Sequence, residues 1–98
     1  MLTNKQKFNI VFGNDKNTTN SLEYISNKMR IPMNDITEVI ERGKAAFYTN
    51  RASVRPHVTS PTHWGYSRLY AFIQHVIKIR KDKSYIPNSD NDLVMKYK

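Results

Sequence analysis

The 98-residue chain contains no cysteine, only three glycines and one tryptophan, and half as many acidic as basic residues. The absence of cysteine excludes a disulfide scaffold and any zinc site that uses thiolate ligands. The three glycines lie too far apart to form a glycine-rich phosphate-binding loop. No apolar run is long enough to cross a bilayer, and the first residues lack the apolar stretch of a signal peptide. We therefore expect one small domain without a membrane segment.

The charge of the chain is strongly positive. Sixteen Lys and Arg residues against eight Asp and Glu residues give a formal net charge of +8. A surface of this sign attracts polyanions such as nucleic acid, an anionic membrane or an acidic partner protein. The same excess can also serve solubility alone, so charge leaves the partner open.

Residues 1–20 are rich in Asn, Lys and Thr and contain one short apolar run. Phe8, Ile10 and Phe12 alternate at the spacing of a strand, and turn-forming residues follow Gly13. We expect a polar arm with a short strand, which either docks on its own domain or pairs with another subunit. The polar surroundings favour a partner contact through these three apolar residues.

The apolar spacing of the next segment predicts two helices separated by Pro32. Ser21 is suited to cap the first helix, and the second begins near Asn34 or Asp35 and continues to Tyr48. Gly43 lies inside the second helix. It indicates either a close approach by another helix or the end of the helix.

This pair of helices resembles a helix-turn-helix unit, whose second helix enters the major groove when it binds DNA. The exposed positions of the second helix include Asp35, Glu38 and Glu41. Their carboxylates would repel phosphate, so a plain αα-hairpin is favoured.

A third, longer helix is predicted from Pro61 to about Arg80, with Ser60 as its cap. Its apolar positions make a core face: Trp64, Leu69, Phe72, Ile73, Val76 and Ile77. Tyr66 and Tyr70 lie on another side and are candidates, together with Tyr48, for an exposed contact. Its end is cationic, which suits the helix dipole and marks a candidate basic surface: Lys78, Arg80, Lys81 and Lys83.

The predicted fold class is therefore mainly α: a small domain of three helices, with a helix-turn-helix-like pair and one long helix, and an extended N-terminal arm. The arm covers residues 1–20, the helical core domain residues 21–83, and a C-terminal tail residues 84–98. Within the tail, residues 93–95 form either a last helical turn on the core or a partner contact.

No catalytic site, metal site or cofactor is expected. The three histidines, His57, His63 and His75, lack the spacing and the nearby carboxylates of a metal site. Ser53 or Ser60 could pair with His57 or His63, but no carboxylate or oxyanion loop accompanies them.

Arginines beside the tryptophan are the strongest candidates for a specific role. Arg51 and Arg55 lie in the loop between the second and third helices, and Arg68 follows Trp64 by one helical turn. Guanidinium groups can fix a loop through several hydrogen bonds or bind phosphate. Loop fixing is the favoured alternative.

Several motifs occur in a recognisable order: ERGKAAF at residues 41–47, SVRP at 53–56, SPTHWGYSR at 60–68 and DNDL at 90–93. Their order and spacing resemble a small family of proteins of tailed bacteriophages, including marine and cyanobacterial ones, and of some large DNA viruses. Ser67 stands where many of these proteins have alanine, and the second glycine or histidine-arginine pair before the proline is missing. The family has no established activity; the resemblance implies a viral origin.

These observations predict a non-enzymatic bacteriophage protein, a structural or assembly component of the virion that binds other capsid or tail proteins. It would be located in the virion, and in the host cytoplasm during assembly, in multiple copies. A nucleic-acid-binding protein with DNA as its partner, and an inhibitor of a host protein, are the alternatives.

Overall fold

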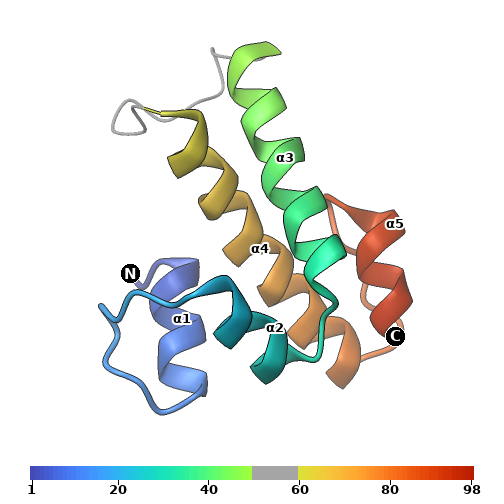
Figure 1. Cartoon of the computed structure of the whole chain (residues 1–98). Coiled ribbons are helices and arrows are strands. Elements are labelled where there is room, and N and C mark those ends of the chain that lie inside the picture. The colour runs from blue at the N-terminus through green and yellow to red at the C-terminus, as the bar shows by residue number, and fades with distance from the viewer. Residues whose placement is uncertain (50–59) are drawn as a thin grey trace. The chain divides into compact units, whose positions relative to one another are not determined.

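A computed structural model describes residues 1–49 and 60–98, which form helices and contain no strand (Figure 1). This confirms the mainly α fold class. The elements in chain order are α1 (Asn4–Val11), α2 (Leu22–Met29), α3 (Met33–Thr49), α4 (Pro61–Lys81), α5 (Asn91–Val94) and a 3-10 turn, η2 (Met95–Tyr97). Among the described helices, none combines the length and apolar character that crossing a membrane requires.

The chain divides into two compact units. Unit 1 combines Met1–Asn20 with Tyr70–Lys98, and unit 2 is the continuous segment Ser21–Leu69. Helix α4 contributes its first residues to unit 2 and the remainder to unit 1.

The α2–α3 pair of unit 2 begins and turns at the predicted positions. The Ser21 hydroxyl accepts a hydrogen bond from the backbone N–H of Tyr24 at 3.1 Å, as expected of a cap. Helix α2 ends at Arg30, which has a left-handed φ of 55°, and the N–H of Ile31 bonds the carbonyl of Ser26. This is the Schellman arrangement, in which a residue other than glycine occupies the left-handed position. Helix α3 follows directly after Pro32.

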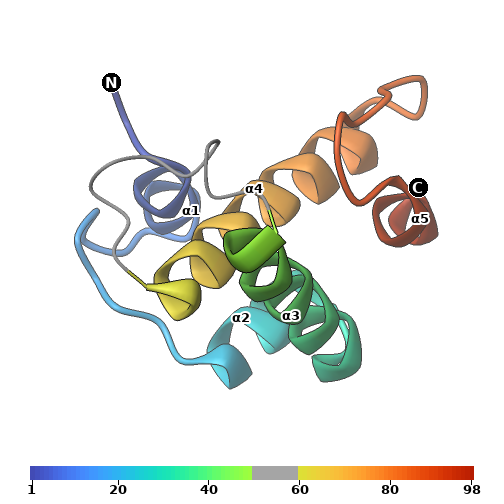
Figure 2. The ribbon, with the colours of Figure 1, turned by 90° about the horizontal axis from the view of Figure 1, so that it is seen from above.

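Helices α3 and α4 approach closely within unit 2, and both ribbon views show α3 beside the start of α4 (Figures 1 and 2). A Cβ atom placed on Gly43 would lie 2.6 Å from the Cα of Gly65. Helix α3 continues past Gly43 to Thr49, so the glycine marks a close approach and not a helix end. In the part of unit 2 that the structure describes, the buried apolar side chains are Ile25, Met29, Ile31, Ile36, Val39, Ile40, Phe47 and Leu69.

The N-terminal apolar run is helical, and the strand predicted for it is wrong. A capping box starts α1: the Thr3 hydroxyl accepts from the N–H of Gln6, and the Gln6 side chain accepts from the N–H of Thr3. Phe8 is fully buried, with its ring centroid 4.9 Å from that of Phe12 and 5.8 Å from that of Tyr70. Phe8 and Phe12 are also four residues apart, so one turn of helix brings the two rings together.

A buried asparagine ties the polar residues after α1 to unit 1. The Asn9 amide donates to the carbonyls of Lys16 and Thr18, both at 3.0 Å, and its oxygen accepts from the Asn20 amide at 2.8 Å. Asn20 also donates to the Tyr70 hydroxyl on α4 at 3.2 Å. The polar composition of residues 1–20 therefore serves an internal hydrogen-bond network.

The second part of α4 and the chain end complete unit 1. Phe72, Ile73 and Val76 are buried as predicted, whereas Tyr70 is also buried, contrary to its expected exposure. The predicted core positions Trp64 and Ile77 are half-buried. Leu93 and Val94 are buried in α5, whereas Met95 begins η2 and is exposed.

Candidate docking surface

The end of α4 and the residues after it carry exposed positive charge. Lys78, Arg80, Lys81 and Lys83 are all exposed, as the sequence predicted. Three of them lie in the last turn of α4, where cations interact favourably with the helix dipole. The side chains of these three residues remain exposed to solvent while they interact with the helix dipole.

An aromatic contact brings the chain end beside this cluster. The guanidinium of Arg80 lies 5.4 Å from the ring centroid of Tyr97, a cation–π geometry, and Tyr97 packs edge-on against Phe72 at 6.2 Å. Lys96 and Lys98, which flank Tyr97, are exposed. We refer to Lys78, Arg80, Lys81, Lys83, Lys96 and Lys98 together as the C-terminal cations.

The carboxylate of Asp82 lies between Lys81 and Lys83 in the sequence. It is exposed, and it accepts hydrogen bonds from the Ser84 hydroxyl at 2.6 Å and the Ser84 N–H at 3.0 Å. These two bonds lower the pKa of Asp82, so the carboxylate stays ionised and shapes the turn after α4.

Among residues 1–49 and 60–98, the exposed large aliphatic side chains all belong to unit 1. Ile86 is 78% exposed and Met95 41%, and both lie in segments that carry C-terminal cations. The other large aliphatic side chains that are exposed among the described residues are Met1, Leu2, Ile10 and Val11, also of unit 1. In the described part of unit 2, the large exposed apolar residues are two tyrosines.

Charge follows the same division. Unit 1 has nine Lys and Arg against four Asp and Glu, a formal charge of +5, and unit 2 has seven against four, or +3; together the units cover the whole chain. In unit 2, Glu38 pairs with Arg42 at 3.3 Å and Glu41 with Lys44 at 3.4 Å. Unit 1 therefore combines exposed apolar side chains with the larger positive charge.

The three apolar residues predicted as a partner-contact arm have different fates. Phe8 is buried inside unit 1 and Phe12 is half-buried, so neither is displayed as an arm would display it. Ile10 is 51% exposed on α1. Only Ile10 of this group lies on the surface as predicted.

The arginine candidates are only partly described. Arg51 and Arg55 lie outside the described residues. Arg68 and Trp64 are half-buried on α4, and the Arg68 side chain lies beside Gly43, 3.2 Å from the position of an added Cβ. The Arg68 side chain thus borders the close approach of α3 and α4.

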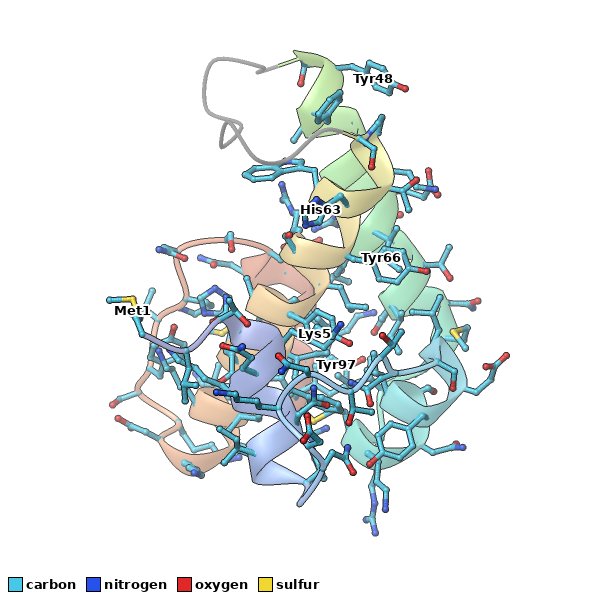
Figure 3. The ribbon with its side chains drawn as sticks, turned by 90° about the vertical axis from the view of Figure 1, so that its left-hand side faces the viewer. Met1, Lys5, Tyr48, His63, Tyr66 and Tyr97 are labelled. Atoms are coloured by element: carbon cyan, nitrogen blue, oxygen red, sulfur yellow. The ribbon has the colours of Figure 1, made fainter. Side chains whose placement is uncertain are left out.

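Of the tyrosines predicted as exposed contacts, two are on the surface. Figure 3 shows Tyr48 projecting from the end of α3 and Tyr66 from α4, with exposed fractions of 68% and 36%. The outward face of α3 also carries exposed Glu38 and Glu41. These carboxylates weaken the case for α3 as a DNA-reading helix, since phosphate and carboxylate repel each other.

Sequence reasoning missed a histidine-centred contact in unit 1. His75 on α4 lies with Nδ1 2.7 Å from the Tyr85 hydroxyl and Nε2 3.4 Å from the Ser89 hydroxyl. Ten and fourteen residues separate these partners from His75, and the chain reverses between them, so no local spacing signals the contact. Within residues 1–49 and 60–98, His, Cys, Asp and Glu form no group of three that could hold a metal ion.

Comparison with known proteins identifies a family but no activity. No curated protein and no solved structure matches the chain. A family of unknown function, DUF5824, matches residues 1–95, which is almost the whole chain. The chain therefore belongs to the DUF5824 family.

Proposed function

We propose that the chain is a non-enzymatic bacteriophage protein that docks through unit 1 onto an acidic surface of another virion protein. The observation that carries this proposal is the coincidence, in unit 1, of the exposed large aliphatic side chains with the excess of positive charge. The viral setting rests on the motif resemblance described above.

The exposed aliphatic side chains favour a protein partner over a polyanion alone. Ile86 and Met95 expose apolar surface, and removing such surface from water favours association with a protein partner. A phosphate backbone offers little apolar surface to cover them, whereas a protein interface has an apolar core and a polar rim. The C-terminal cations would face the acidic rim, where they mainly accelerate association and select the partner.

The location is tested by mass spectrometry of purified particles of the virus that encodes the chain. We expect the protein in the particles at a constant copy number. Its absence from both mature particles and assembly intermediates would contradict the proposal.

The surface is tested by a pair of variants in the same particles. Ile86→Ser combined with Met95→Ser should lower the copy number, because apolar contact is lost while the charge stays the same. Tyr48→Ser is the matched control, since it removes an exposed apolar side chain from unit 2. An equal loss in both variants would show that unit 1 is not the docking surface.

Duplex DNA is the second candidate partner, and the six C-terminal cations favour it. When a protein binds DNA through phosphates, the logarithm of the binding constant falls linearly with the logarithm of the salt concentration. The slope is about −0.9 for each phosphate contacted. Lys81→Gln combined with Lys83→Gln should make this slope less steep, whereas Ile86→Ser should leave it unchanged. Fluorescence anisotropy of a labelled duplex decides: absence of binding at low salt removes DNA as a candidate.

A further inference from the structure

His75 connects α4 to the segment 82–90 through both of its ring nitrogens. Its Nδ1 contacts the Tyr85 hydroxyl at 2.7 Å, and its Nε2 contacts the Ser89 hydroxyl at 3.4 Å. The rings of His75 and Tyr85 are stacked, with centroids 6.0 Å apart and planes inclined by 26°. Both hydrogen bonds described for the side chains of Tyr85 and Ser89 are made with His75 on α4.

The same segment displays Ile86. Tyr85 is half-buried and Pro87 is buried, while Ile86 between them points outward with 78% of its surface exposed. At its start, the segment is shaped by the turn at Asp82, whose carbonyl accepts a hydrogen bond from the N–H of Tyr85 at 3.1 Å. The contact of His75 with Tyr85 and Ser89 therefore brackets Ile86 on both sides.

Burial, more than the neighbouring charges, opposes protonation of His75. Lys78, on the next turn of α4, also lies over the Tyr85 ring, 5.7 Å from its centroid. Burial and the charge of Lys78 lower the pKa of His75, and the nearby carboxylate of Asp90 offsets this in part. A proton on His75 would place a charge in a half-buried site beside a like charge, and both hydroxyls would then have to accept hydrogen bonds.

We propose that His75 is a proton-sensitive anchor that holds the segment 82–90 on α4 when neutral and releases it when protonated. Release would free Ile86 from its fixed position and so weaken docking through unit 1. The effect on docking rests on the proposed function, whereas the anchor itself does not. An acidic environment would then loosen the docking surface without unfolding unit 2.

The anchor is tested by nuclear magnetic resonance of the whole chain. The His75 ring should titrate below the ordinary histidine value of about 6.5, and the amides of Tyr85, Ile86 and Ser89 should shift with the same midpoint. The protection of these amides from hydrogen exchange, corrected for intrinsic exchange rates, should fall as pH falls. The fall should reach about tenfold for each pH unit between two His75 titration midpoints: that of the released segment and that of the segment held on α4.

His75→Gln is the decisive variant, because glutamine can donate and accept hydrogen bonds but does not titrate. The pH dependence of residues 82–90 should disappear in it and persist in the control His63→Gln, which removes a histidine from unit 2. Persistence of the same pH dependence in His75→Gln would overturn the proposal.

Lys78→Gln keeps the proposal testable if His75→Gln fails to fold. Removing the like charge should raise the midpoint of both the His75 ring and the three amides together. An unchanged midpoint, or a shift of the ring without the amides, would also overturn the anchor. Particle incorporation is a separate readout, so a failure of docking would leave the titration result interpretable.

Discussion

Gly43 on α3 and Gly65 on α4 lie opposite each other at a backbone-to-backbone approach. A Cβ atom on Gly43 would lie 2.6 Å from the Cα of Gly65, and one on Gly65 would lie 2.8 Å from the carbonyl oxygen of Ile40. Both neighbours are backbone atoms, which cannot rotate away as the end of a flexible side chain can. The two helices can approach this closely only because both residues are glycine.

Gly43→Ala should therefore destabilise the protein. In an exposed helix the same substitution would stabilise by about 1 kcal/mol. Here overpacking costs about 1–3 kcal/mol, and we expect the cost to exceed the helix-propensity gain. Urea denaturation measures the net effect. Ala45→Gly, at an exposed position of α3, is the control and should lose about 1 kcal/mol with no steric conflict. A more stable Gly43→Ala protein would contradict the close approach.

Asn9→Ala should destabilise unit 1 by about 1–3 kcal/mol, because the carbonyls of Lys16 and Thr18 and the Asn20 amide would lose their shared partner. Asn9 is fully buried, so water cannot easily replace the amide. Thermal denaturation compares it with Asn17→Ala, an exposed asparagine after α1, which should change stability by no more than about 0.5 kcal/mol. Equal effects would show that the network contributes nothing specific.

Arg30→Gly should stabilise the protein by about 0.5–1 kcal/mol. Arg30 holds a left-handed φ of 55° at the end of α2, a conformation that costs about 1–2 kcal/mol for a residue with a Cβ atom. Glycine removes this cost but loses more entropy on folding, which reduces the gain. Arg30→Ala, which keeps the strain and removes the charge, is the control for chemical denaturation. If Arg30→Ala stabilises the protein as much as Arg30→Gly does, the effect comes from removing the charge and not from relieving backbone strain.

The stability of the protein should depend on His75 at mildly acidic pH. Because the pKa of folded His75 lies below that of an unfolded histidine, the unfolded state binds the proton first as pH falls. The stabilisation is complete above about pH 6.5 and is lost as pH falls through the folded pKa. The urea midpoint, compared between the native chain and His75→Gln from about pH 5 to pH 7.5, isolates this contribution from that of the carboxylates. Parallel curves would contradict the lowered pKa.

Local signals in the sequence predicted the helix pair and the long helix correctly. Ser21 caps α2 and Pro61 begins α4, because caps and the first helical position depend on neighbouring residues alone. Gly43 indicated close approach or a helix end, and the structure shows close approach. Exposure of Lys78 and its cationic neighbours was predicted from their position at a helix end.

Features that depend on distant segments could not be predicted in the same way. The apolar run around Phe8 fits a strand by alternation and a helix by the four-residue step to Phe12, and the capping box at Thr3 decides for the helix. Tyr70 is buried because Phe8 and Asn20 reach it from the other end of the chain. The contact of His75 with Tyr85 requires a chain reversal after α4 that no local pattern announces.

Because unit 1 is built from both ends of the chain, its two parts leave the ribosome at different times. Unit 2 is continuous in sequence, so α2 and α3 can pair as soon as Ser21–Leu69 has left the ribosome. Residues 1–20 emerge first, but the partners that cover Phe8 and bond Asn20 arrive only with Tyr70–Lys98. Until then Phe8 lacks its contact with Tyr70, and an exposed apolar side chain of this kind favours aggregation and chaperone binding.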